Sequence, residues 1–220
     1  MKTAVVVAWV TEEEKASFLA GWNATTFQPD WLLLQRDESR EGCGATKNRG
    51  VKRAVELGYD VVVVLDGDCY ACEETPTLES LVERHVAALE PQSVRMYDVV
   101  TDPPSRGTPY ADVTIEMPVA ASMGFWHGVP DYCGVRQLAF DAKPMSFVVD
   151  PIFGRYFPLC GMNVAFKPTE WWPWWQFIEV SRFDDIWMGW ILAARSLPPR
   201  VLFQLERSEN LPFASKQRVE

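Results

Sequence analysis

The apolar run at residues 61–65 is the feature that most constrains how this chain folds. It consists of four consecutive valines followed by a leucine. An unbroken run of mostly β-branched residues is typical of a strand buried on both faces, and parallel α/β sheets build their centres from such strands. The run therefore predicts an α/β protein in which this segment is a central strand.

Two carboxylates follow this run directly, because the chain continues Asp66-Gly67-Asp68. Open α/β sheets bind ligands at the carboxyl ends of their strands. A hard divalent cation that carries a diphosphate needs only a few protein oxygens and fills its remaining positions with water and phosphate. Asp66 and Asp68 are therefore candidate ligands of Mn²⁺ or Mg²⁺, and Asp66 is also a candidate contact for a nucleotide sugar. The alternative is a plain turn, since Asp and Gly both favour turns.

The first third of the chain predicts an alternation of strands and helices. Strands are expected at residues 4–10, 31–35 and 61–65. Helices are expected between them, one capped by Thr11 and one over residues 47–57. This β-α-β-α-β order with short connections is typical of a nucleotide-binding, Rossmann-like and mostly parallel sheet flanked by helices.

The second of these helices brings basic residues close to the expected ligand. Helix N-termini hold anionic groups, and Lys47 and Arg49 lie near its first turn, within reach of a diphosphate. Asp37, at the end of the second strand, is a candidate hydrogen-bond partner of the base or ribose. The alternative for the basic residues is an ordinary charged helix surface.

Length and composition limit the classes of function. At 220 residues we expect one domain, with residues 1–70 as a nucleotide-binding half and residues 71–220 as a half that binds sugar and acceptor. The net charge of −9 opposes non-specific attraction to nucleic acid or to an anionic membrane. No stretch approaches the roughly 20 apolar residues of a membrane span. Five scattered cysteines, an odd number, favour free thiols and a cytoplasmic location.

Several residues of the second half are candidates for structure or for ligand contact. His85, on an amphipathic helix expected within residues 75–90, is expected at the surface. Asp131 lies in a segment rich in aromatic and turn-forming residues, a mixture that often lines a site for a sugar ring. Asn163 precedes an apolar run, and the tryptophans within residues 171–175 favour packing or assembly into a homo-oligomer.

Asp184 and Asp185 stand together at the start of a predicted helix. Adjacent helical residues point about 100° apart, so one acid can face a pocket while its neighbour is hydrogen-bonded. The alternative for both is capping of the helix N-terminus.

Together these segments resemble one family of enzymes. Gly44-Ala45-Thr46-Lys47-Asn48-Arg49-Gly50, followed by Val64-Leu65-Asp66-Gly67-Asp68, is similar to the donor half of glycosyltransferases of the GT-A fold. Three further blocks resemble the reversibly glycosylated polypeptides, also called UDP-arabinopyranose mutases, of glycosyltransferase family 75. These blocks, which accompany Asp66-Gly67-Asp68, are Val129-Pro130-Asp131-Tyr132, Phe157-Pro158-Leu159-Cys160-Gly161-Met162-Asn163 and Arg182-Phe183-Asp184-Asp185-Ile186-Trp187-Met188-Gly189-Trp190.

The resemblance implies a GT-A fold, an Asp-x-Asp metal site and a UDP-sugar donor. Asp184 and Asp185 would orient sugar hydroxyls or act as the base for an acceptor, and Asn163 and Asp131 would contact the sugar. The family also has three consecutive aspartates where this chain has Asp66-Gly67-Asp68, and an arginine that becomes glycosylated. Residues 140–147, where that arginine is expected, contain none.

The missing arginine favours transfer of the sugar to an external acceptor, which is a glycan, a protein, a small molecule or a modified nucleobase. Two alternatives stay open. One is a mutase that isomerises the nucleotide sugar, and the other is a binding subunit that has lost catalysis.

Overall fold

The computed structural model describes residues 1–22, 31–73, 75–95, 114–124, 126–128, 152–153, 159–168, 184–195, 202–204 and 214–216. The β-α-β-α-β order predicted from the sequence is confirmed. It comprises β1 (Thr3–Trp9), α1 (Glu12–Gly21), β2 (Leu32–Arg36), α2 (Cys43–Glu56) and β3 (Val61–Asp66).

The later elements are mostly short strands. They comprise β4 (Cys69–Tyr70), α3 (Leu78–Ala88), β5 (Gln92–Arg95), β6 (Thr114–Met117), β7 (Val119–Met123), β8 (Trp126–Gly128), β9 (Ile152–Phe153), β10 (Asn163–Phe166), α5 (Asp184–Arg195), β11 (Leu202–Gln204) and β12 (Ala214–Lys216).

A mixed seven-stranded sheet forms the centre of the molecule, in the order β2-β1-β3-β10-β7-β11-β9. Strands β2, β1, β3, β7 and β11 run in one direction, whereas β10 and β9 run in the opposite one. The sheet is therefore mostly parallel, as expected, but β10 enters antiparallel beside the central strand β3. Two smaller sheets, β4-β12-β8 and β5-β6, complete the described strands.

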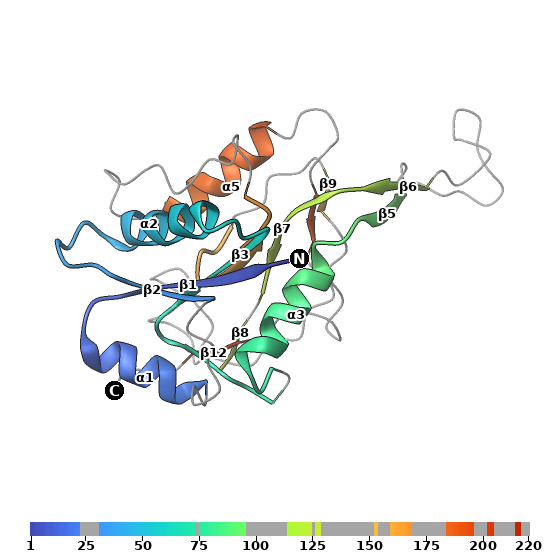
Figure 1. Cartoon of the computed structure of the whole chain (residues 1–220). Coiled ribbons are helices and arrows are strands. Elements are labelled where there is room, and N and C mark those ends of the chain that lie inside the picture. Colours follow the sequence, from blue (N-terminus) through green and yellow to red (C-terminus); the bar gives the residue numbers. More distant parts are fainter. Residues whose placement is uncertain are drawn as a thin grey trace, which may run out of the picture.

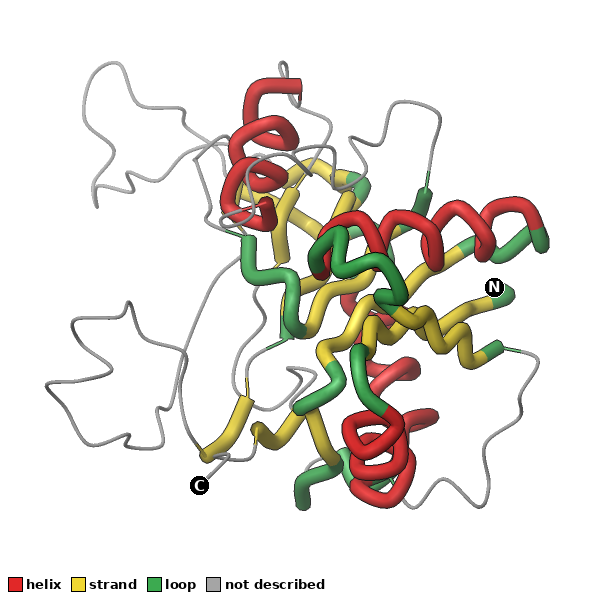
Figure 2. The backbone as a smooth tube through the Cα atoms, turned by 90° about the vertical axis from the view of Figure 1, so that its left-hand side faces the viewer, coloured by secondary structure: helices red, strands yellow, loops and turns green. Residues whose placement is uncertain are grey.

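Helices cover both faces of the large sheet (Figures 1 and 2). α2 and α5 lie on one face, and α1 and α3 lie on the other. Side chains alternate between these layers along each strand, so Val6 and Val64 pack toward α2 while Val5 and Val63 pack toward α1 and α3. β3 has its first five residues fully buried, which confirms the central strand predicted from its unbroken apolar run.

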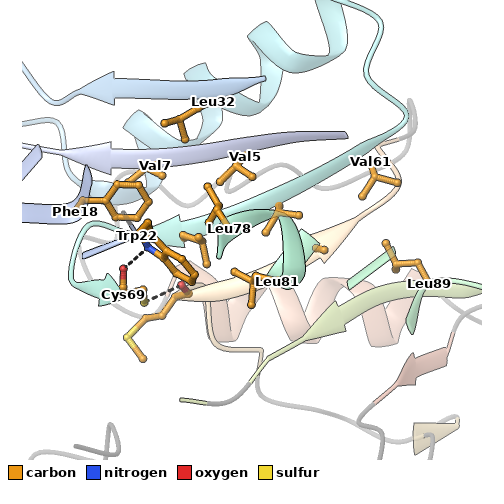
Figure 3. Close-up of a cluster of buried hydrophobic side chains, with 14 of the residues drawn as sticks. Val5, Val7, Phe18, Trp22, Leu32, Val61, Cys69, Leu78, Leu81 and Leu89 are labelled. Carbon is orange, nitrogen blue, oxygen red and sulfur yellow. Dashed lines mark hydrogen bonds between the residues drawn. The ribbon is translucent and has the colours of Figure 1, made fainter. Parts of the chain in front are cut away.

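The core beneath α1 and α3 is built around aromatic and leucine side chains (Figure 3). Phe18 and Trp22 pack there with Leu78 and Leu81, and all four are at most 2% exposed. The indole Nε1 of Trp22 donates a hydrogen bond to the carbonyl oxygen of Cys69 at 2.7 Å (Figure 3). This contact fixes the end of α1 against the segment that follows the Asp66-Gly67-Asp68 turn.

The helix starts follow from local chemistry. Thr11 caps α1, as the sequence predicts, by accepting a hydrogen bond from the Glu14 N–H. The Glu14 carboxylate accepts a hydrogen bond from the Thr11 N–H in return, which completes a capping box. α2 instead begins after Gly42, whose φ of 102° favours glycine. No helix within the described residues is long and apolar enough to cross a membrane. Cys43, Cys69, Cys72 and Cys160 are free thiols.

Candidate functional site

A cavity of about 590 Å³ lies at the carboxyl ends of β1 and β3, next to α1. It is lined by Ala8, Trp9, Val10, Glu13, Glu14, Ser17, Asp37, Cys43, Asp66, Gly67, Asp68 and Tyr70. Ligands of open α/β sheets bind at this edge. Three of the predicted site residues, Asp37, Asp66 and Asp68, therefore share one cavity.

A second cavity, of about 650 Å³, lies at the opposite end of β1. Its walls include Met1, Thr3, Val82 and Val86, and it contains none of the residues that the sequence singles out for chemistry. We therefore place the candidate site at the first cavity.

The lining of the site is strongly acidic. Glu13, Glu14, Asp37, Asp66 and Asp68 all line the cavity, and the described lining includes no lysine or arginine. Such a surface repels a diphosphate unless a cation lies between them.

Asp66 is paired with Lys47 across the sheet edge. The Lys47 ammonium lies 2.6 Å from Asp66 Oδ1 and donates a second hydrogen bond to the Gly161 carbonyl oxygen at 2.9 Å. Lys47 is only 4% exposed and is not among the described lining residues of the cavity. The structure thus places this lysine behind Asp66, and its predicted contact with a diphosphate stays a prediction.

Arg49 is engaged on the outer side of α2. Its guanidinium pairs with Glu41 at 2.5 Å and donates to the Arg36 carbonyl oxygen at 3.1 Å. A hydrogen bond from Ser39, together with the Arg49 charge, lowers the pKa of the Glu41 carboxyl. Arg49 is likewise absent from the described cavity lining, so its contact with a diphosphate also stays a prediction.

Asp37 holds the loop that leads into α2. Its two carboxylate oxygens accept hydrogen bonds from the backbone N–H groups of Glu41 and Gly42, at 2.9 and 3.0 Å. The side chain is 8% exposed and still borders the cavity. Its position is therefore fixed before any ligand arrives.

The metal site predicted at Asp66 and Asp68 has two candidate carboxylates. No group of three or more His, Cys, Asp or Glu side chains suited to a metal occurs within the described residues. Two oxygen ligands fit Mn²⁺ or Mg²⁺ in the mode where phosphate and water complete the shell. The thiol of Cys43 lies 3.9 Å from Asp66 Oδ1, beside this pair.

Asp185 reaches the candidate site indirectly. Its Oδ2 accepts a hydrogen bond from the Gly161 N–H at 3.0 Å, and its Oδ1 accepts one from the Ile186 N–H at 2.8 Å. Asp185 thus joins α5 to the Cys160-Gly161-Met162-Asn163 block, a contact that the sequence reasoning did not foresee. The side chain of its neighbour Asp184 lies outside the described residues.

Cys160 lies in the electrostatic field of the same groups. Burial raises the pKa of its thiol to about 12, and the nearby Asp185 and Asp66 charges act in the same direction. The thiolate is the reactive form of cysteine, so Cys160 stays protonated and inert at neutral pH.

Asn163 lies in the core and contacts another buried polar residue. Its Oδ1 lies 2.8 Å from His85 Nε2, and His85 Nδ1 lies 3.0 Å from Ser122 Oγ. All three residues are at most 1% exposed. The predicted contact of Asn163 with sugar stays a prediction.

The expectation of a surface position for His85 is wrong. His85 is 0% exposed, and it shares the buried face of α3 with Leu78, Leu81 and Ala88. Its spacing of four residues after Leu81 was the available signal, because that spacing repeats on one helix face. Burial lowers the pKa of His85 to about 4, so the ring is neutral at neutral pH.

Asp131 and residues 171–175 lie outside the described residues, so the structure does not place the predicted sugar contact or the predicted assembly segment.

No family model matches this chain. Curated proteins that it resembles include "Probable UDP-arabinopyranose mutase 1" of Pisum sativum, 28% identical over 148 residues, which are 60% of this chain and 41% of that protein. "UDP-arabinopyranose mutase 3" of Arabidopsis thaliana is 29% identical over 59% of this chain and 40% of its own length. "UDP-arabinopyranose mutase 1" of Oryza sativa subsp. japonica is 26% identical over 60% and 41%. The chain spans about two fifths of the length of these relatives and is similar to UDP-arabinopyranose mutases over about 60% of its own.

Proposed function

We propose that this chain binds a UDP-sugar together with a divalent cation at the carboxyl ends of β1 and β3, and isomerises the sugar as a nucleotide-sugar mutase. The observation that carries the proposal is the similarity to proteins named UDP-arabinopyranose mutases. The cavity that contains Asp66 and Asp68 supports it, because a carboxylate pair at this sheet edge suits the metal complex of a diphosphate.

The acidic lining supports metal dependence. A bound Mn²⁺ or Mg²⁺ would neutralise the diphosphate and stabilise the charge that develops on it when the anomeric bond breaks. Asp66 and Asp68 would hold the ion from the protein side. Asp37 would accept a hydrogen bond from a ribose hydroxyl, since an ionised carboxylate has about four acceptor positions and the two backbone donors use only two.

The two classes of reaction differ in what happens to UDP. A mutase returns the sugar to the same UDP, so the pyranose and furanose forms interconvert and no UDP accumulates. Transfer to an acceptor is the second candidate, favoured by the absence of arginine from residues 140–147, and it releases UDP. The acceptor would be a glycan, a protein, a small molecule or a modified nucleobase. A subunit that only binds the nucleotide sugar neither interconverts the pyranose and furanose forms nor releases UDP.

The test is incubation of the protein with UDP-arabinopyranose and manganese, followed by chromatographic separation of the pyranose form, the furanose form and free UDP. We expect the furanose form to appear without release of UDP. Release of UDP that depends on an added acceptor would replace the mutase with a transferase. An unchanged nucleotide sugar would leave the binding subunit as the function.

A carboxylate variant checks the metal site in the same assay. Asp68→Asn removes one proposed oxygen ligand, so we expect manganese-dependent turnover to fall by about tenfold or more, the usual order for loss of a hydrogen-bonded or ion-bound charge. Asp60→Asn is the matched control, because Asp60 precedes β3 at the opposite end and contacts the Lys2 backbone. Unchanged turnover in Asp68→Asn would remove this residue from the metal site.

A further inference from the structure

A continuous set of contacts links the candidate metal site to the start of α5. Asp66 pairs with Lys47, and Lys47 donates to the Gly161 carbonyl oxygen. The Gly161 N–H then donates to Asp185 Oδ2 at 3.0 Å. We call these four residues the Asp66–Asp185 network.

Lys47 is the buried charged residue of the Asp66–Asp185 network. An ammonium that is 4% exposed is stable only when it is paired and hydrogen-bonded, and Asp66 and Gly161 provide the pair and an acceptor. Asp66 differs, because its side chain is 26% exposed and borders the cavity. The lysine therefore contacts the carboxylate from the protein side, while a ligand meets the carboxylate from the cavity side.

This arrangement has two effects on Asp66. The contact to Oδ1 fixes the direction of the carboxylate, and the positive charge offsets part of the negative charge of the cavity wall. In metal sites, residues that contact a ligand side chain but not the metal often orient that ligand.

We propose that Lys47 is a positioning residue, which orients the Asp66 carboxylate for a divalent cation and ties it through Gly161 to Asp185 without touching the nucleotide sugar. The inference rests on the proposed function, because the cation and the nucleotide are those of the UDP-sugar site. It also assigns Lys47 a different task from direct contact with a diphosphate.

The test compares UDP affinity by calorimetry in saturating Mn²⁺ and in EDTA. We expect Lys47→Met to lower the manganese-dependent affinity about tenfold, the order for loss of a charged hydrogen-bond partner, and to leave the affinity in EDTA unchanged. Lys52→Met is the matched control, because it removes the same charge from the exposed side of α2 and should change neither affinity.

A double-mutant cycle tests whether Lys47 acts through Asp66. In an Asp66→Asn background, Lys47→Met should cause no further loss, because the carboxylate that it positions is already gone. The double variant is also useful if Lys47→Met does not fold. It removes both charges of the pair together, so no unpaired charge is left. An equal loss with and without manganese, or an additive loss in the Asp66→Asn background, would overturn the proposal.

The unmodified protein separates this inference from the proposed function. Absence of UDP binding by the unmodified protein would overturn the UDP-sugar site itself. In that case the amide signal of Gly161 in ¹H–¹⁵N spectra still tests whether Lys47 contacts Gly161. We expect that signal to shift in Lys47→Met and to stay in place in Lys52→Met, whereas no shift in Lys47→Met would overturn the link to Gly161.

Discussion

Two basic residues of α2 form ion pairs in different places, one buried and one at the surface. Lys47 and Arg49 are two residues apart near the start of α2, and both were candidates for a diphosphate. Lys47 neutralises Asp66 inside the protein, whereas Arg49 neutralises Glu41 at the surface. One signal was available for Lys47, because its spacing to Val51 and Ala54 puts it on the buried face of the helix. Its partners were not predictable, since Gly161 is 114 residues away.

The buried His85 makes stability depend on pH. Its pKa is about 4 in the folded protein and 6.5 as the ordinary value, so the unfolded chain binds more protons between these limits. The His85 contribution to the free energy of unfolding is therefore complete above about pH 6.5. It falls as the pH drops toward 4, by up to about 1.4 kcal/mol per pH unit.

Urea unfolding at several pH values between 4 and 7 measures this dependence. His85→Gln removes the titrating group and should flatten that part of the slope, although it also lowers the stability at pH 7. Ser122→Ala removes the hydroxyl beside His85 Nδ1 but keeps the titrating ring, so it is the control and should keep the slope of the unmodified protein. An identical slope in His85→Gln and the unmodified protein would contradict the assignment.

At the scale of elements, α2 is held against the sheet by a close approach at Gly50. A Cβ at this position would lie 2.3 Å from Val6 Cγ1 and 2.8 Å from Gln35 Cγ. We therefore expect Gly50→Ala to lower the free energy of unfolding by about 1–3 kcal/mol through overpacking. Because α2 also carries Lys47, the variant should weaken manganese-dependent UDP binding as well.

Two control variants are compared with Gly50→Ala by thermal or chemical unfolding. Lys52→Ala, on the exposed side of the same helix, should stay within about 0.5 kcal/mol of the unmodified protein. Gly58→Ala has open space around its Cβ but a φ of 72°, so only backbone strain of about 1 kcal/mol is expected. A Gly50→Ala variant as stable as Lys52→Ala would show that α2 can move away from β1 without cost.

The elements that sequence reasoning located well are those whose patterns are local. The buried strand β3 follows from its apolar run, and the start of α1 follows from Thr11 and Glu14. The antiparallel direction of β10 was not predictable, because the three apolar residues that follow Asn163 pair equally well in either direction. The contact of Asp185 with Gly161 depends on that direction and was missed for the same reason.

For the whole molecule, ligand binding should appear as stabilisation. A ligand that binds only the folded state, at about 100 times its Kd, adds about 2.7 kcal/mol to the free energy of unfolding. We therefore expect UDP with Mn²⁺ to raise the melting temperature by several degrees in a thermal-shift experiment. UDP in EDTA and Mn²⁺ alone are the controls, and each should give a smaller shift. Equal shifts with and without the metal would argue against a cation at Asp66 and Asp68.

The antiparallel course of β10 also determines when a binding-competent site can exist. The residues just before β10 meet the end of β3, as the hydrogen bond from the Asp66 N–H to the Met162 carbonyl oxygen at 3.0 Å shows. Contacts so distant along the chain form late, because the intervening loop must first be closed. A nascent or partly folded chain would therefore display the acidic turn without the loop that supports it. Capture of manganese and nucleotide would then report that the chain has finished folding.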